Sequence, residues 1–182
     1  MRAVVVYESM YGNTHLIADA VAEGLAPLGA VEVVPVGGAT EAVLAGADLL
    51  VVGGPTHIHG MSSAMSRKGA VADATKPEKD LHLDPDAEGP GLREWFETAD
   101  GLPVKAAAFD TRMPGSPALT GRASKGITKR LHHHGCEMVA EPMSFLVTKD
   151  NHLADDEREH ARAWGAELAV ACAASADASR SG

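Results

Sequence analysis

The 182-residue sequence has only two cysteines, Cys136 and Cys172, and their separation matches no metal-binding or redox motif. Two such thiols predict no disulfide framework and no nucleophile; they are typical of buried residues in a reducing compartment. No apolar run approaches the roughly 20 residues of a membrane span, and no basic region precedes the apolar N-terminal run as in a signal peptide. We therefore predict a cytoplasmic protein without a membrane span.

Lysine and arginine are absent from residues 3–66. A phosphate bound in this stretch must therefore be held by neutral donors and a helix dipole, without an ion pair. The stretch lacks the Gly-Lys-Ser/Thr ending of a nucleotide-triphosphate P-loop and the Gly-x-Gly-x-x-Gly of dinucleotide binders. The whole chain has a formal net charge of −9, which argues against nucleic acid or an anionic membrane as partner and is compatible with a basic redox partner.

The chain is organised around residues 3–25. An uninterrupted apolar run over 3–7 predicts a strand buried on both faces, and paired apolar residues every four positions over 16–25 predict an amphipathic helix. The turn between them, 9–14, is rich in hydroxyl groups and glycine. Free backbone N–H groups and a helix N-terminus then meet at one point, which suits a phosphate. The alternative is an ordinary strand–turn–helix with Thr14 as its cap.

Four further strands are predicted, over residues 31–36, 48–52, 103–109 and 137–147, the last interrupted at Pro142. The helices predicted between and after them cover residues 40–45, 62–75, 92–99, 120–134 and 155–174. Five strands alternating with helices give an α/β fold, a three-layer sandwich around a five-stranded parallel sheet. We predict a single domain over 1–174 and a flexible tail over 175–182.

Three features outside this pattern have plain interpretations. Residues 76–91 contain five acidic residues and three prolines, and their spacing matches no EF-hand, so they are predicted to form an exposed acidic insertion. The histidines at 132–134 point in three directions on a helix and predict no metal site. Trp95 is predicted to serve packing or a contact between subunits, which leaves a homo-oligomer open.

The turn at 9–14 resembles that of flavodoxin-like proteins, which wrap the phosphate of FMN in a Ser/Thr-x-Thr-Gly-x-Thr sequence. Ser9, Gly12 and Thr14 match this pattern, and Tyr11 replaces the middle threonine. The run Ser-Met-Tyr-Gly before a helix is similar to the NAD(P)H:quinone reductase branch. The resemblance implies FMN as the cofactor and the sheet order 2-1-3-4-5, in which the carboxyl ends of the first, third and fourth strands meet.

Two further loops carry the resemblance. Residues 55–58 stand where flavodoxin-like proteins pass the flavin ring, and residues 111–113 stand where many electron-transfer flavodoxins stack a tyrosine. His57, Ile58 and Met61 are the candidates for covering the ring. The residues predicted to bind the cofactor are Ser9, Met10, Tyr11, Gly12, Asn13, Thr14, Pro55, Thr56, His57, Ile58, Thr111, Arg112 and Met113.

Two functions remain open, and no catalytic residue is assigned. In the first, the Arg112 guanidinium stabilises negative charge at the N1–C2=O edge of the flavin, which favours reduction by NAD(P)H and transfer to a quinone or another small electrophile. His57 or His59 would then supply a proton. In the second, the chain is a non-catalytic electron carrier that docks a protein redox partner through its acidic face and the segment around Trp95. The alternative for Arg112 is a solvent-facing loop arginine.

Overall fold

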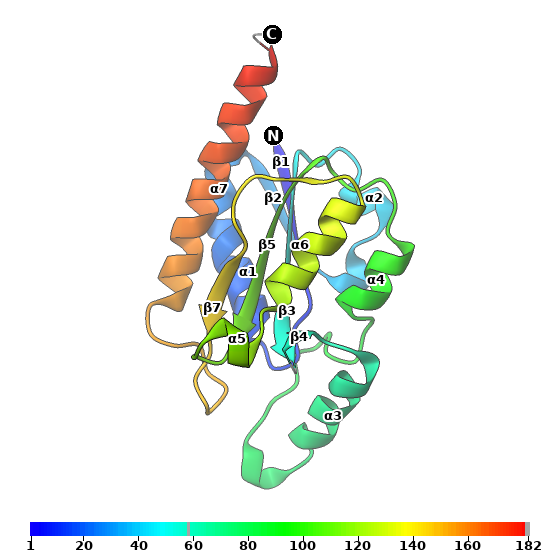
Figure 1. The fold of residues 1–182 in the computed structure, drawn as a ribbon, viewed down its shortest axis with the longest axis vertical. Helices are drawn as coiled ribbons and strands as arrows, with labels where there is room; N and C mark the ends of the chain where they lie inside the picture. The colour runs from blue at the N-terminus through cyan, green and yellow to red at the C-terminus, as the bar shows by residue number, and fades with distance from the viewer. Residues whose placement is uncertain (58, 181–182) are drawn as a thin grey trace.

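The computed structural model describes residues 1–57 and 59–180, which form a parallel sheet with helices on both faces (Figure 1). The strands follow the order β2-β1-β3-β5-β6, with β4 paired to β3 and β7 paired to β5. With β6 and β7 counted as the two pieces of the interrupted last strand, the predicted order 2-1-3-4-5 is confirmed. The strands are β1 (Arg2–Tyr7), β2 (Ala30–Pro35), β3 (Leu49–His57), β4 (Gly60–Met61), β5 (Lys105–Arg112), β6 (Glu137–Met138) and β7 (Met143–Leu146).

Helices α1 and α7 cover one face of the sheet, and α4 and α6 cover the other. The side chains of β1 alternate between these two layers: Val5 packs with the first pair, and Val4 and Val6 pack with the second. A strand buried on both faces needs apolar residues at every position, as the sequence predicted. The helices are α1 (Asn13–Leu25), α2 (Glu41–Leu44), α3 (Ala64–Ala74), α4 (Leu92–Thr98), α5 (Pro117–Thr120), α6 (Ala123–His133) and α7 (Glu157–Arg180), with short 3₁₀ turns at Ala26–Leu28, Val36–Gly38 and Pro77–Lys79.

Two strands continue past the residues where the sequence predicted them to end. β3 runs through Gly53 to His57, and β5 runs through Asp110 to Arg112. The two strands pair in parallel as far as Pro55 and Thr111, and their last residues pair with β4 and β7. Gly53 is needed in β3 because a Cβ there would lie 2.0 Å from Cζ of Phe109. The glycines therefore make room inside the sheet rather than ending the strand.

The segment 76–91 is mostly exposed, as predicted, but single residues in its second half are buried. Asp84 and Ala87 are buried, and the Asp84 N–H donates to the Met10 carbonyl at 2.9 Å. The Asp84 carboxylate also lies 3.1 Å from Nδ1 of His15 in α1. This half of the segment thus supports the turn after β1.

Trp95 and the two cysteines are buried, as the sequence predicted, whereas the last helix is longer than predicted. Trp95 is buried, and its Nε1 donates to the Ala39 carbonyl at 3.0 Å, so it serves packing. Cys136 and Cys172 are buried, and burial raises the pKa of both thiols, which disfavours a nucleophilic thiolate. Helix α7 extends to Arg180, beyond the predicted end at residue 174.

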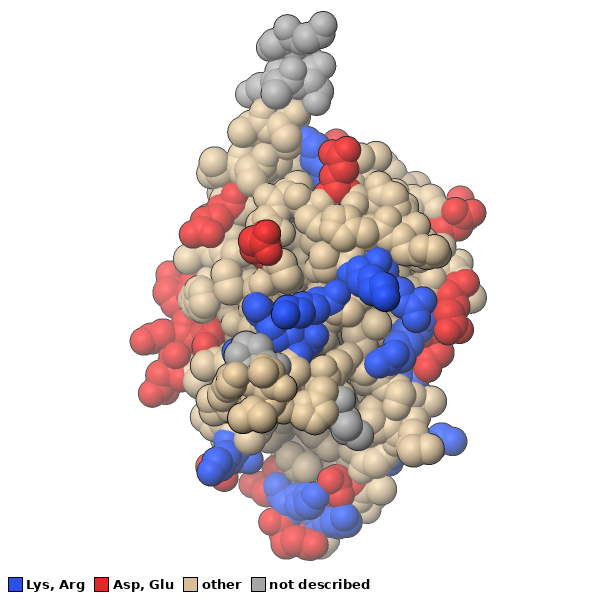
Figure 2. Space-filling view, in the orientation of Figure 1, with Lys and Arg blue, Asp and Glu red and all other residues tan. Residues whose placement is uncertain are grey.

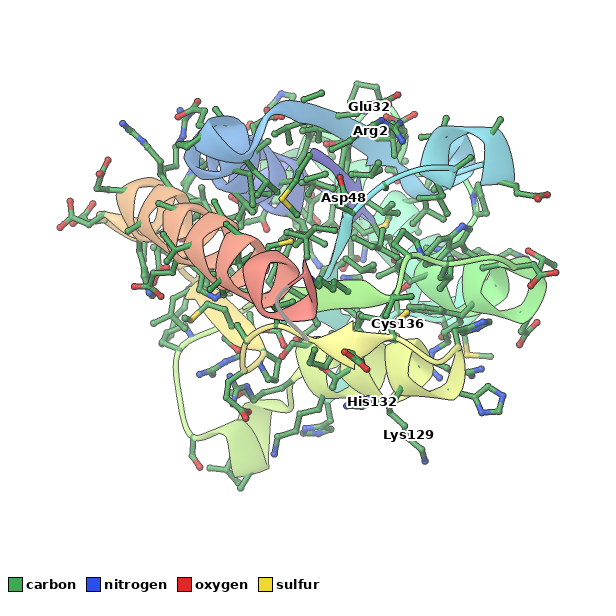
Figure 3. All side chains as sticks on the ribbon, turned by 90° about the horizontal axis from the view of Figure 1, so that it is seen from above. Arg2, Glu32, Asp48, Lys129, His132 and Cys136 are labelled. Atoms are coloured by element: carbon green, nitrogen blue, oxygen red, sulfur yellow. The ribbon has the colours of Figure 1, made fainter. Side chains whose placement is uncertain are left out.

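Charged side chains interact at the amino ends of the strands. At the amino ends of the strands, the Arg2 guanidinium donates to the Glu32 carboxylate at 2.8 Å, and the Arg2 backbone N–H donates to the Asp48 carboxylate at 2.7 Å (Figure 3). On the face shown in Figure 2, basic side chains gather across the middle, where α6 runs, and acidic ones lie mostly near the outline. None of the described helices is long and apolar enough to cross a membrane.

Candidate functional site

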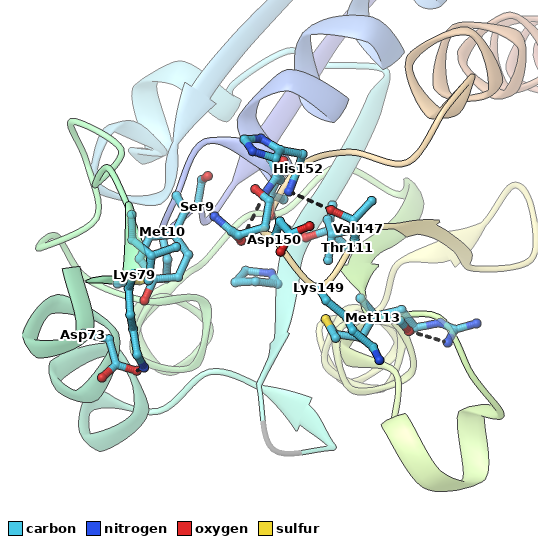
Figure 4. Close-up of a pocket in the computed structure, with 18 of the residues that line it drawn as sticks. Ser9, Met10, Asp73, Lys79, Thr111, Met113, Val147, Lys149, Asp150 and His152 are labelled. Atoms are coloured by element: carbon cyan, nitrogen blue, oxygen red, sulfur yellow. Dashed lines mark hydrogen bonds and ion pairs between the residues drawn. The ribbon is translucent and has the colours of Figure 1, made fainter. Parts of the chain in front are cut away.

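A cavity of about 750 Å³ lies at the carboxyl ends of β1, β3 and β5 (Figure 4). Its size is in the ordinary range for small-molecule and cofactor sites. Gly12 belongs to the turn beside it without lining it, and Ile58 lies outside the described residues. The predicted site residues that do line it are Ser9, Met10, Tyr11, Asn13, Thr14, Pro55, Thr56, His57, Thr111, Arg112 and Met113. The three predicted loops are thus brought together.

The turn after β1 presents the N-terminus of α1 to this cavity. Gly12 adopts φ 88°, a left-handed conformation that glycine tolerates without a Cβ penalty, and its N–H donates to Oγ of Ser9 at 3.1 Å. Among the described residues, no side chain caps α1, so its first-turn N–H groups are left for another acceptor. Thr14 lies inside the helix, so the alternative in which it serves as the cap is wrong.

Hydrogen bonds between side chains fix this turn relative to its neighbours. Oγ1 of Thr14 lies 2.8 Å from Oγ1 of Thr111 at the end of β5, and both residues are buried. Nδ2 of Asn13 donates to the Asn151 carbonyl at 2.9 Å. These contacts order the rim of the cavity before any ligand binds, which reduces the entropic cost of binding.

The end of β3 contributes one candidate for covering a ring. His57 lines the cavity, whereas Met61 is buried in the core layer beside Gly126 and does not. His59 is also absent from the cavity lining. Burial lowers the pKa of His57, the Glu8 carboxylate opposes this effect, and the Arg67 guanidinium adds to it. The His57 imidazole is therefore neutral at neutral pH, which disfavours its predicted role as a protonated acid.

Arg112 is held from one side and unpartnered on another. Its Nη1 donates to the carbonyls of Met113 and Gly115 at 3.2 and 3.0 Å, and to Oγ1 of Thr120 at 3.1 Å. Its Nε is buried and has no hydrogen-bond partner among the described residues. A buried N–H without an acceptor is costly, and the contacts of Nη1 fix the side chain, so Arg112 is not a plain solvent-facing loop arginine.

Sequence reasoning missed a fourth wall of the cavity, residues 147–152, which follow β7. Because β7 pairs in parallel with β5, its carboxyl end must meet the same edge of the sheet, so the rule used for the other loops could have found it. Lys149 belongs to this wall; its side chain is exposed and has no ion pair within the described part of the chain.

A further wall comes from the segment after α3, on the opposite side of the cavity from Lys149 in the view of Figure 4. Here Nζ of Lys79 and Nζ of Lys76 each lie 2.6 Å from the Asp73 carboxylate. These hydrogen bonds lower the pKa of Asp73 to about 2, so it is ionised at neutral pH. The residues at 9–14 remain neutral donors as predicted, but segments distant in sequence add charge around them.

The chain was compared with known proteins by sequence and by structure. No protein-family model matches it, and no curated protein matches it significantly. Among solved structures, a flavodoxin from the domain Archaea is 20% identical, with a TM-score of 0.61 over 94% of this chain and 99% of that one. Flavodoxin 1 from Bacillus cereus is 22% identical, with a TM-score of 0.61 over 92% and 97%.

A flavodoxin-type WrbA-like protein from Agrobacterium tumefaciens is similar at 21% identity, with a TM-score of 0.55 over 94% of this chain and 96% of that one. Likeness at such low identity concerns the fold. The chain therefore has a flavodoxin-like fold, as the sequence predicted.

Proposed function

We propose that the chain binds FMN in this cavity and acts as a redox protein. The observation that carries the proposal is the uncapped N-terminus of α1 beside Gly12, at the meeting point of three strand ends. Amides and hydroxyls at 9–14 would hold the phosphate, and residues 55–57 and 111–113 would contact the ring. When bound, FMN supplies the capacity to accept and release electrons in steps of one or two.

The residues already in place fit this cofactor. Arg112 lines the cavity between Thr111 and Met113, and its Nη1 is held by the Met113 and Gly115 carbonyls. The Arg112 guanidinium also places positive charge where a reduced ring would carry negative charge. His57, neutral at neutral pH, would serve as a hydrogen-bonding wall of the ring site rather than as an acid.

The specific function that we propose is reduction of a quinone or another small electrophile, with NAD(P)H as electron donor. Its support is a second hollow, of about 580 Å³, which shares Tyr11, His57 and Asp73 with the first cavity. A small second substrate bound there would lie next to the cofactor. Its far wall is formed by α3, where Gly69 and Ala70 leave room.

A non-catalytic electron carrier is the second candidate function. It is favoured by a different observation, the exposed basic residues on α6 close to the cavity, which suit docking of a redox protein. The buried position of Trp95 removes the docking contact that the sequence had assigned to it.

We expect the purified protein to bind FMN in a one-to-one ratio with a dissociation constant below about 1 μM, a value typical of a ligand buried in a preformed site. Quenching of FMN fluorescence during titration measures this affinity, and visible absorption shows whether the cofactor is retained. Riboflavin, which lacks the phosphate, is the control and should bind at least tenfold more weakly. Equal binding of riboflavin would contradict the phosphate site at 9–14.

We expect the FMN-loaded protein to oxidise NAD(P)H steadily when benzoquinone is supplied and no separate reductase is added. The reason is that donor and acceptor can reach the cofactor through the cavity and the second hollow in turn. Absorbance at 340 nm measures the rate, and free FMN at the same concentration is the control. If NAD(P)H were oxidised only when a separate reductase was added, the proposed enzyme function would be contradicted and the electron carrier would be favoured.

A further inference from the structure

Residues 111–136, which begin at the cavity wall, carry a positive charge, opposite in sign to the net charge of the whole chain. Residues 111–136 contain no aspartate or glutamate, although the chain as a whole has a net charge of −9. Four basic residues of this region lie on or next to α6: Arg122, Lys125, Lys129 and Arg130. We call these four the basic face. Figure 2 shows basic side chains gathered across the middle of the molecule, over the part where Figure 1 draws α6.

None of these four residues forms an ion pair with a carboxylate in the described part of the chain. Arg122 donates instead to Oγ of Ser144 and to the Pro142 carbonyl, at 3.0 and 3.1 Å. Lys125 and Lys129 are exposed, and Figure 3 shows Lys129 pointing away from α6 and from the sheet. Some cations elsewhere are paired, as in the 2.9 Å contact between Arg67 and Glu94, whereas Lys149 at the cavity is unpaired within the described part of the chain. The charge of the basic face is therefore available to an external partner.

Arg130 lies in the last turn of α6, where the helix dipole favours a cation, but the dipole does not explain Lys125. Lys125 lies in the first turn of α6, where the helix dipole favours acidic residues and a cation is unfavourable. Helix α7 follows the usual preference, with Glu157 and Glu159 in its first turn. The placement of Lys125 thus slightly opposes helix stability, so it points to a function other than stabilising the helix.

The start of α6, from which the basic face extends, adjoins the cavity. The N–H of Ala123, at the start of α6, donates to Oγ1 of Thr56, which lines the cavity, at 2.9 Å. Just before α6, Leu119 is 75% exposed, and Met113 on the cavity wall is 42% exposed. Exposed apolar residues beside unpaired charges are typical of a docking surface, in which a small apolar centre is bordered by charge.

We propose that the basic face, together with Met113 and Leu119, docks an acidic redox protein at the mouth of the cavity. Charge complementarity selects the partner, because four unpaired cations would attract an acidic surface and hold it close to the cofactor site. The proposal rests on the proposed redox function, and it serves either of the two candidate functions. It reverses the expectation from net charge alone, which was a basic partner.

The test uses a strongly acidic [2Fe–2S] ferredoxin as the probe and titration calorimetry at low ionic strength as the measurement. We expect Lys125→Glu/Lys129→Glu to weaken ferredoxin binding at least fivefold. The matched control is Lys68→Glu/Arg158→Glu, which makes the same change in net charge on α3 and α7, and it should alter the affinity less than twofold. Raising the salt to about 0.2 M should weaken binding to the unmodified protein, because it shortens the screening length to below about 10 Å.

Three results would overturn the proposal: equal weakening by both double variants, tighter binding of basic cytochrome c than of ferredoxin, or tighter binding of a single-stranded oligonucleotide. FMN content is measured separately by visible absorption. A colourless protein that still binds ferredoxin through the basic face would support the docking surface and contradict the FMN function. A yellow protein that does not bind ferredoxin would support the FMN function and contradict the docking surface.

Discussion

We expect Gly24→Ala to lower the free energy of unfolding by about 3 kcal/mol, the upper end of the usual cost of overpacking. Helices α1 and α7 cross with their backbones in contact: a Cβ on Gly24 would lie 2.1 Å from the carbonyl oxygen of Arg162 and 2.8 Å from the backbone nitrogen of Ala166. No side chain can rotate to relieve such a contact, so α7 must move away. In a chain of this size the melting temperature should fall by roughly 5–15 °C, measured by thermal denaturation.

Gly69→Ala is the matched control for this substitution. Gly69 also lies inside a helix, α3, but a Cβ there would meet no described atom within 4 Å. Alanine has a higher helix propensity than glycine, so this variant should be more stable by up to about 1 kcal/mol. The same chemical change is thus expected to act with opposite sign at the two positions. A similar shift in both variants would mean that the α1–α7 crossing is not tightly packed.

The parts of the fold that sequence reasoning predicted correctly share one physical property. The centre of the sheet is buried on both faces, which demands apolar residues at consecutive positions, and the run at Val4, Val5 and Val6 shows this directly. The strand order followed from the resemblance, and the meeting of three strand ends followed from the order. Eleven site residues could therefore be placed at the cavity from the sequence alone.

The parts that were predicted wrongly depend on contacts between segments distant in sequence. Gly53 looks like a turn residue, but it is a strand residue because the Phe109 ring occupies the space of its missing side chain. Asp84 looks like part of a solvated acidic loop, but it is buried against His15 and the Met10 carbonyl. Local composition carries no information about contact partners that are distant in sequence. For this reason the burial of Asp84 could not be predicted from the composition of residues 76–91.

The positive charge of the surface near the cavity was also not predicted from the sequence. Net charge is a sum over the chain, and it does not show that acidic residues are excluded from 111–136. Once the fold places α6 beside Thr56, that local excess of basic residues lies at the cavity mouth. An electrostatic argument about partners therefore needs the position of each charge, and the total is a poor guide.

We expect Gly12→Ala to weaken FMN binding at least tenfold, or about 1.4 kcal/mol. Gly12 precedes the uncapped N-terminus of α1 with φ 88°, and a Cβ there would enter space that is free of described atoms. If the phosphate is held by the amides of this turn, an alanine that strains the left-handed conformation of Gly12 will also displace those amides. Fluorescence titration with FMN measures the loss of affinity, and the melting temperature without FMN measures any change in stability.

Gly46→Ala separates loss of the phosphate site from backbone strain. Gly46 has φ 72°, its Cβ would likewise meet no described atom within 4 Å, and it lies in an exposed turn between α2 and β3, away from the cavity lining. Alanine in a left-handed conformation costs about 1 kcal/mol at either position, so both variants should melt at similarly reduced temperatures. Only Gly12→Ala should lose FMN affinity, because only that turn carries the amides proposed to hold the phosphate. If FMN bound both variants equally well, the cofactor would be held by some part of the chain other than the turn at 9–14.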